Sequence, residues 1–333
     1  MKTSKFLRMV RILPALAVAA LVAGAPAQAG YPDKPVRLIV PYATGGSSDV
    51  IARGIGDQLG AALGQPVVVE NRAGAGSMIG TAYVAGEAAD GYTLLLADVP
   101  FTIVPALYGG RIKYDARKDF APIALLGVSP MYLFVNPRFE GKTVPALIAA
   151  AKDKPGSISI GSGGNGSLTH LMAELFMLNT GIRLVHIPYK GASASVNDLA
   201  GGQIQVSFTT MPTAAALFQG GKIAPIAVSS PAREAATPDV PTFEELGLPR
   251  LTVQSWWGLM APAGTPKPVL DKLERAMATV MQSAPVRQRL GSVGVAPPED
   301  PSAQALTRLL NADNPVINVL ASMTGLSASS RLT

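Results

Sequence analysis

Two segments of the sequence place glycines and small hydroxyl side chains directly after an apolar run. The first reads LIVPYATGGSSD over residues 38–49, and the second reads ISIGSGGNGS over residues 158–167. In each segment the apolar run predicts a strand, and a helix pattern follows the glycines. A helix N-terminus has free N–H groups and partial positive charge, and glycines let a ligand approach the backbone closely. Each segment is therefore a candidate anion-binding loop.

The polar side chains of these loops have two open roles. Ser47, Ser48, Asn165 and Ser167 are of types that commonly cap helices, and glycine-rich turns between strands and helices are common. The same side chains can reach a ligand, because open α/β sheets bind ligands at the carboxyl ends of their strands. One loop alone fits capping, whereas two matched loops on two lobes could hold one anion from both sides.

Three further side chains stand near the ends of expected strands. Asp98 either faces a cleft at the sheet edge or caps the turn before Pro100. Tyr42 and Tyr189 either form walls of a binding pocket or pack in the core. The residue types leave both roles open for each of the three.

Two segments imitate nucleotide-binding motifs without completing them. Residues 161–166 fit the pattern G-x-G-x-x-G, but the next expected strand ends in PYK, without the acidic residue that holds a ribose. Residues 141–143 read GKT, but Asn136 stands where a phosphate-binding loop needs glycine. We therefore expect no nucleotide and no other cofactor.

The two histidines of the chain, His170 and His186, are weak candidates for catalysis. His170 follows Ser167 by three residues, which leaves a serine hydrolase as an alternative. Glu174 is expected one turn too far along the helix to orient His170, so the base lacks an acid. His186 falls in an apolar strand pattern and is interpreted as a core residue. The histidine spacing and the lack of cysteine predict no metal site.

Strand and helix patterns alternate along the chain. Strands are expected at residues 36–40, 67–70, 92–97, 121–128, 131–135, 158–160, 184–187, 206–208 and 223–228, and helices at 49–63, 77–88, 144–152, 168–178 and nearly continuously after Pro266. This order predicts an α/β fold with mostly parallel sheets flanked by helices. The repeated glycine-rich loop predicts two lobes, residues 30–127 with 254–333 and residues 128–253, joined by two crossovers.

The first 29 residues read as a signal peptide. Four basic residues precede an apolar run at residues 12–24, and Ala27-Gln28-Ala29 predicts cleavage between Ala29 and Gly30. The run is shorter than the roughly 20 residues that span a bilayer. Without this segment the chain keeps 24 basic and 22 acidic residues of the original 28 and 22, so no basic surface predicts a nucleic-acid partner. We expect a periplasmic protein without a permanent membrane anchor.

Six short motifs in fixed order resemble the Bug family of periplasmic receptors, the substrate-binding components of tripartite tricarboxylate transporters. They are YPDKPVR at residues 31–37, PYATGGSSD at 41–49, ENRAGAG at 70–76, DGYTL at 90–94, HIPYKG at 186–191 and APAGTP at 261–266. The resemblance extends from about residue 31 to the C-terminus. It implies a two-lobe Venus flytrap fold, a periplasmic-binding-protein fold that closes around its ligand.

The resemblance also implies which residues bind. In the family a ligand carboxylate is held by backbone N–H groups, small hydroxyls and ordered waters of the two loops. By position these are Tyr42, Thr44, Gly45, Gly46, Ser47 and Asp49 in the first loop, and Ser162, Gly164, Asn165, Ser167 and His170 in the second. The family often has proline where this chain has Thr44, so the loop geometry can differ here. Lys190, next to Tyr189, either meets a distal acid group of the ligand or lies in solvent.

Together these observations predict a receptor for a small carboxylate. We expect it to be a monomer that performs no catalysis and delivers its ligand to a large and a small membrane subunit. Two alternatives stay open: a sensor that presents its ligand to a histidine kinase, and a periplasmic hydrolase.

Overall fold

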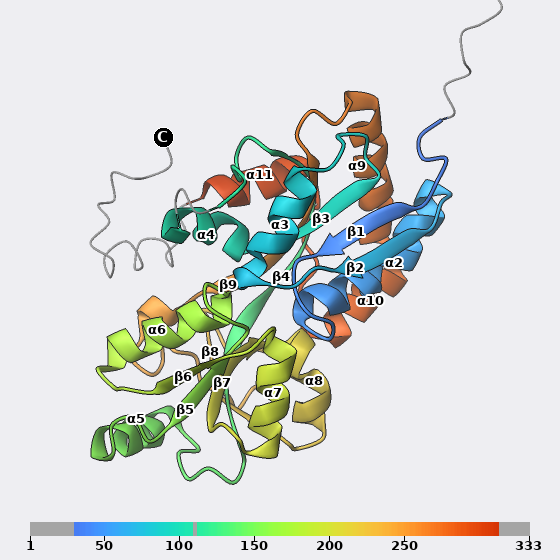
Figure 1. Cartoon of the computed structure of the whole chain (residues 1–333). Coiled ribbons are helices and arrows are strands. Elements are labelled where there is room, and N and C mark those ends of the chain that lie inside the picture. Colours follow the sequence, from blue (N-terminus) through green and yellow to red (C-terminus); the bar gives the residue numbers. More distant parts are fainter. Residues whose placement is uncertain (1–29, 109–111, 313–333) are drawn as a thin grey trace, which may run out of the picture. The chain divides into compact units, whose positions relative to one another are not determined.

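A computed structural model describes residues 30–108 and 112–312 of the chain (Figure 1). The predicted signal peptide lies outside the described residues. Every helix and strand in the described part of the chain belongs to a unit that begins at Lys34. Among the residues that the structure describes, no helix combines the length and the apolar character needed to cross a membrane.

One part of the sheet consists of parallel strands with nearly continuous apolar sequences. These are β1 (Val36–Val40), β2 (Val67–Asn71) and β3 (Thr93–Asp98), in the order β2-β1-β3. Strands β1 and β3 are almost wholly buried, as expected where helices cover both faces of a parallel sheet. The helices that follow these strands are α2 (Ser47–Leu63), the short η1 (Ala75–Ser77) with α3 (Met78–Ala85), and α4 (Pro100–Tyr108).

A second group of strands repeats this arrangement later in the chain. They are β5 (Ser159–Ser162), β6 (Val185–Pro188), β7 (Val206–Thr210) and β8 (Ala224–Val228). Strand β5 pairs with β6 and β7 in parallel. The accompanying helices are α5 (Val144–Asp153), α6 (Leu168–Thr180), α7 (Ala192–Gly201) and α8 (Met211–Gln219).

A single long strand, β4 (Phe120–Val135), connects the two groups (Figure 1). Its first part pairs antiparallel with β9 (Gln254–Pro262), which also pairs with β3. From Met131 onward it pairs with β7 and β8. The sequence predicted two strands separated by Ser129 and Pro130, and this prediction was wrong. Pro130 is the last residue paired with β9, so the N–H that proline lacks falls where the strand changes partner.

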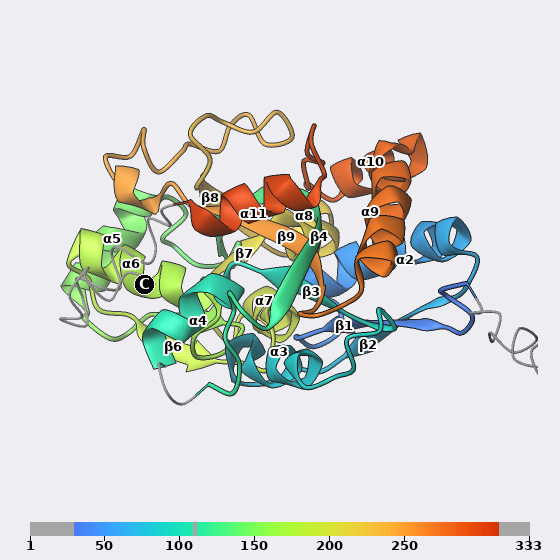
Figure 2. The same cartoon turned by 90° about the horizontal axis from the view of Figure 1, so that it is seen from above.

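The C-terminal helices return to the first group of strands, as predicted. They are α9 (Lys267–Gln282), α10 (Ala284–Ser292) and α11 (Ala303–Asn311). Helices α9 and α10 lie beside α2, and α11 covers β4 (Figure 2). In α9 the buried residues Leu273, Met277 and Val280 recur at helical spacing and face the protein interior. The α/β fold with helices flanking the strands is confirmed. Among the described strands, four pairings are parallel and four are antiparallel, because β4 and β9 run against their neighbours, so the sheet is mixed.

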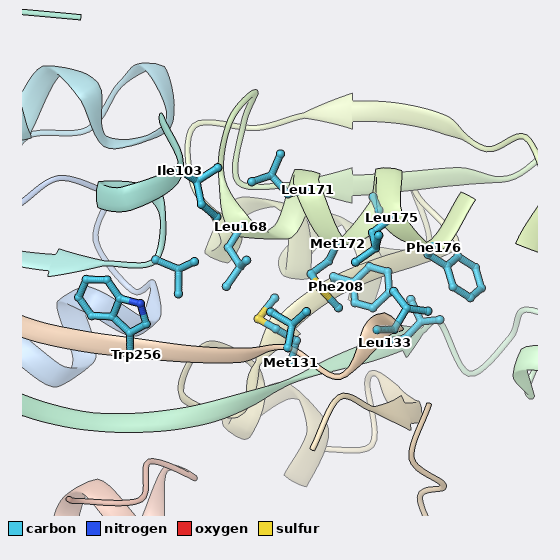
Figure 3. Close-up of a cluster of buried hydrophobic side chains, with 14 of the residues drawn as sticks. Ile103, Met131, Leu133, Leu168, Leu171, Met172, Leu175, Phe176, Phe208 and Trp256 are labelled. Atoms are coloured by element: carbon cyan, nitrogen blue, oxygen red, sulfur yellow. The ribbon is translucent and has the colours of Figure 1, made fainter. Parts of the chain in front are cut away.

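The apolar face of α6 fixes the position of the second glycine-rich loop. Leu168, Met172 and Phe176 are buried along this face and point toward Met131 of β4 and Phe208 of β7 (Figure 3). Burying such a side chain contributes about 1.5–3 kcal/mol. The first turn of α6, which ends the loop, is therefore held rigidly against the sheet.

Candidate functional site

A cavity of about 60 Å³ lies among loops from both groups of strands, with room for several water-sized groups. Small, hydroxyl-bearing and apolar residues make up most of its wall. The lining residues are Tyr42, Ala43, Gly46, Ser47, Ser48, Asp98, Met131, Gly163, Ser167, Leu168, Thr169, Gly191, Ala192, Thr209, Thr210 and Ser255. Among the described residues, no lysine, arginine or histidine lines this cavity.

Four helix N-termini meet at this cavity. The N-cap residues of α2, α6, α7 and α8 are Gly46, Ser167, Gly191 and Thr210, and all four line the wall. In α2, α7 and α8 no side chain caps the first turn. The free N–H groups and the helix dipoles give the cavity a positive potential without a basic side chain. The arrangement suits an anion.

The predicted first-loop residues divide into two groups. Tyr42, Gly46 and Ser47 line the cavity, whereas Thr44, Gly45 and Asp49 do not. Thr44 and Gly45 are exposed, and Asp49 is buried under the loop. The Asp49 carboxylate accepts hydrogen bonds from the Gly45 N–H at 3.0 Å and from Arg53 Nε at 3.0 Å. Asp49 therefore shapes the loop from behind.

A chain of hydrogen bonds extends this support. Arg53 also donates to Asn71 Oδ1 at 3.1 Å, and Asn71 Nδ2 donates to the Tyr42 carbonyl oxygen at 3.0 Å. Burial alone would raise the pKa of Asp49, but the bonds from Arg53 and Gly45 outweigh it and keep the pKa below its usual value. Asp49 thus stays ionised and holds the loop ordered.

Among the residues that the structure describes, Asp98 at the end of β3 carries the one carboxyl group of the cavity wall. The Tyr42 hydroxyl donates to Asp98 Oδ1 at 2.9 Å. Burial raises the pKa of Asp98 to about 7, although hydrogen bonds from Tyr42 and Ser48 act in the opposite direction. Of the two roles left open by the sequence, the structure places Asp98 on the cavity wall.

The predicted residues of the second loop also divide into two groups: some line the cavity, and others lie behind the loop. Ser167 lines the cavity and caps α6, because its Oγ accepts from the His170 N–H at 3.3 Å and donates to the Gly164 carbonyl oxygen at 2.7 Å. Ser162 lies behind the loop, where its Oγ accepts from the Gly164 N–H at 3.1 Å. Ser162, Gly164, His170 and the exposed Asn165 do not line the cavity.

His170 and His186 lie together behind this loop, with ring centroids 4.3 Å apart. His186 Nε2 lies 2.6 Å from Ser162 Oγ, and His170 Nε2 lies 3.5 Å from Glu174 Oε1. The expectation that Glu174 is too distant from His170 was wrong, because residues four apart share one face of a helix. Burial lowers the pKa of both rings, and the charge of His170 lowers that of His186 further.

Tyr189 and Lys190 lie away from the cavity wall. The Tyr189 hydroxyl donates to Asp198 Oδ2 at 2.7 Å, and burial together with Asp198 raises the pKa of Tyr189 to about 12. Lys190 is exposed, which matches the solvent role among the two left open by the sequence.

Comparison with known proteins identifies the family. Residues 51–320 match the tripartite tricarboxylate transporter family receptor, TctC. The chain belongs to the TctC family. It is 38% identical over 296 residues to the protein BugT of Bordetella pertussis strain Tohama I, a match that covers 87% of this chain and 90% of BugT. The predicted Bug-family resemblance is therefore confirmed.

Solved structures agree with the assignment of this TctC-family receptor. The periplasmic binding protein BugD matches with a TM-score of 0.83 and 32% identity, over 89% of this chain and 99% of BugD. MatC of Rhodopseudomonas palustris with bound malate has a TM-score of 0.82 and 28% identity, over 88% and 99% of the two chains. R. palustris Rpa4515 with adipate has a TM-score of 0.82 and 30% identity, over 89% and 98%. These matches show the periplasmic-binding-protein fold, and two of them carry carboxylates.

Part of the receptor's cavity wall comes from residues that the sequence did not single out. They are Thr209 and Thr210 at the end of β7, Met131 of β4, Ser255 of β9, and the first residues of α7. Thr210 Oγ1 is buried without a hydrogen-bond partner, which marks it as a group that a ligand could satisfy. The sequence did contain one signal for a helix N-terminus at Thr210. Pro212 stands in the first turn of α8, and proline is favoured where a helix starts.

Loops from the two groups of strands touch each other beside the receptor's cavity. The Ser193 hydroxyl donates to the Thr44 carbonyl oxygen at 3.0 Å. A Cβ atom on Gly191 would lie 3.1 Å from the Ala43 Cβ, and one on Gly76 would lie 2.7 Å from the Asn165 carbonyl oxygen. Only glycine permits so close an approach of backbone to backbone.

Proposed function

We propose that this receptor binds a small organic acid by its carboxylate and delivers it to the large and small membrane subunits of a tripartite tricarboxylate-type transporter. The observation that carries the proposal is the meeting of the α2, α6, α7 and α8 N-termini at one cavity. Hydrogen bonds to a charged group contribute about 1.5–3 kcal/mol each, so three or four suffice for a carboxylate without an arginine. The malate and adipate bound to two structural neighbours support this ligand class.

Binding is coupled to closure of two lobes, residues 30–127 with 254–333 and residues 128–253. The hydrogen bond between Ser193 and Thr44 and the close approach of Gly76 to Asn165 support this division, because they join loops of the two sheet groups. The two lobes hinge at β4, where the strand changes partner, and at the segment that enters β9. A ligand that contacts both lobes shifts the population toward the closed form.

The receptor performs no chemistry on its ligand. The Ser167 hydroxyl is engaged as the cap of α6, and this supports a binding role over that of a nucleophile. The protein acts as a periplasmic monomer after export and cleavage between Ala29 and Gly30. Intact-mass measurement of the secreted protein tests the cleavage site, and a mature chain that begins elsewhere would correct it.

Isothermal titration tests the binding function. The mature protein is unfolded, dialysed and refolded to remove bound ligand, then titrated with monocarboxylates, dicarboxylates and amino acids. We expect at least one acid to bind with a one-to-one stoichiometry, and mass spectrometry of the ligand released from fresh protein to give an acid. If no acid binds and none is released, the proposed function is wrong. Uptake of the same acid should require this receptor and both membrane subunits.

A further inference from the structure

The charge on the cavity wall is opposite to what a second carboxylate needs. Asp98 contributes a carboxyl group, and among the described residues no basic side chain lines the cavity beside it. The helix N-termini can neutralise one carboxylate of a ligand. A second carboxylate near Asp98 would meet a like charge in a confined space of low dielectric, where repulsion is strong.

The Asp98 carboxylate can accept a further hydrogen bond. It accepts hydrogen bonds from the Tyr42 hydroxyl at 2.9 Å, from Ser48 and from its own backbone N–H. Trp257 Nε1 donates to Ser48 Oγ at 3.1 Å, which leaves the Ser48 proton free to point at Asp98. An ionised carboxylate accepts about four hydrogen bonds, so about one position remains free. Thr210 Oγ1, also on the wall, is buried without a partner.

We infer that the ligand is a small amino carboxylate, whose carboxylate meets the helix N-termini and whose ammonium group meets Asp98. This inference rests on the proposed function, since it assigns the second half of the same ligand. The ammonium group supplies a donor for the remaining acceptor position of Asp98. It also cancels the Asp98 charge, which a dicarboxylate cannot do without binding a proton.

The two ligand classes differ in the sign of their pH dependence. Burial raises the pKa of Asp98 to about 7 in the protein without ligand. An ammonium group favours ionised Asp98, so binding releases a proton and tightens about tenfold between about pH 6 and pH 8. A dicarboxylate requires protonated Asp98 and weakens by the same factor over this range.

Few other groups can produce this effect. The titratable groups that face Asp98 are Tyr42 and Tyr114, and burial raises the pKa of both phenols, so they stay neutral over this range. His170 and His186 do not line the cavity, and burial lowers the pKa of both imidazoles. The Asp98→Asn variant isolates the contribution of Asp98 from theirs.

The test is a titration of the mature protein with acids matched in chain length. The probes are glycine, L-alanine, β-alanine and 4-aminobutyrate, the dicarboxylates malonate, succinate and glutarate, and the plain acids propionate and butyrate. We expect an amino acid of the panel to bind tightest, and its binding to tighten about tenfold between about pH 6 and pH 8. Asp98→Asn should weaken it at least tenfold and remove this pH dependence. Asp153→Asn, an exposed aspartate at the end of α5, serves as the matched control and should change nothing.

The outcomes separate this inference from the proposed function. If a dicarboxylate binds tightest and tightens as the pH falls, acids bind but the amino carboxylate assignment is wrong. Equal binding of an amino acid and its plain analogue overturns the assignment as well. If no acid binds at all, the proposed function fails and this inference fails with it. The pH dependence of the unmodified protein decides the matter even if Asp98→Asn does not fold.

Discussion

The Ser193 hydroxyl donates a hydrogen bond of 3.0 Å to the Thr44 carbonyl oxygen, although the two residues are 149 positions apart in the chain. Ser193 lies in the first turn of α7, and Thr44 lies in the loop between β1 and α2. The bond therefore joins α7 directly to the first glycine-rich loop beside the cavity. It contributes to affinity only if it forms when the lobes close.

Removing this hydroxyl should weaken ligand binding without altering the fold. A neutral hydrogen bond contributes about 0.5–1.5 kcal/mol net, so Ser193→Ala should raise the Kd about two- to twelvefold. Ser292→Ala is the matched control, since the Ser292 hydroxyl also donates to a carbonyl oxygen, that of Arg289 at 2.8 Å. Titration of both variants with the tightest-binding acid decides the matter. An unchanged Kd for Ser193→Ala would show that the bond does not contribute to closure.

A methyl group on Gly76 should obstruct the contact between the two sides. Its Cβ would lie 2.7 Å from the Asn165 carbonyl oxygen, a separation that forces the backbones apart. Gly221 has nearly the same backbone angle, φ +63° against +60°, but its Cβ would meet no atom within 4 Å. Both alanine variants strain a left-handed residue by about 1–2 kcal/mol. Only Gly76→Ala should also weaken binding, by about tenfold or more, since the clash exceeds that strain.

Small-angle scattering provides an independent measurement for this pair. With saturating ligand, Gly221→Ala should contract as the unmodified protein does, whereas Gly76→Ala should remain more expanded. Equal contraction and equal affinity of the two variants would mean that Gly76 does not limit closure.

Local sequence patterns were enough to predict where the two glycine-rich loops of this site lie in the chain. Apolar runs before glycines located both loops, because strand, turn and helix signals all lie within one segment. The family resemblance, applied to the positions in these segments, predicted ligand contacts at Tyr42, Gly46, Ser47 and Ser167, and all four line the cavity. For Asp98 the sequence left two roles open, since a strand-end carboxylate can cap a turn or face a cleft.

Residues that reach the cavity only through sheet pairing could not be predicted in this way. Thr210 and Ser255 line one wall because β7 and β9 both pair with β4, and pairings of such distant segments leave no local signal. Asp49 was predicted to touch the ligand and instead supports the loop through the Gly45 N–H. Its sequence position is compatible with both roles, and the side-chain direction depends on the loop geometry.

Thr210 offers a test of whether a ligand uses an unsatisfied hydroxyl. Its Oγ1 is buried without a partner and its residue lines the cavity, so Thr210→Val keeps the shape and removes one hydrogen-bonding group. We expect the unliganded protein to keep or gain stability, and the Kd to rise about two- to twelvefold. Thr213 Oγ1 is also buried without a partner but does not line the cavity, so Thr213→Val should leave the Kd unchanged. A loss of affinity in both variants would point to a general effect on α8.

The adjacent rings of His170 and His186 should make the fold less stable in acid. Burial lowers the pKa of His170 and His186 below the unfolded value of about 6.5, so the unfolded chain binds more protons between the two pKa values. The histidine contribution to stability is therefore fully present above about pH 6.5, and it is lost as the pH falls below that value through the lower pKa of the folded protein.

Replacing one ring isolates this contribution. His186→Gln keeps a nitrogen near the position of Nε2, which lies 2.6 Å from Ser162 Oγ, but cannot take up a proton. Urea unfolding of both proteins at several pH values should show that the unmodified protein loses more of its unfolding free energy between about pH 7 and pH 5 than the variant does. Parallel losses would mean that His186 has the same pKa in the folded and unfolded chains. The variant should bind ligand as before at neutral pH, because His186 does not line the cavity and its ring is already uncharged there.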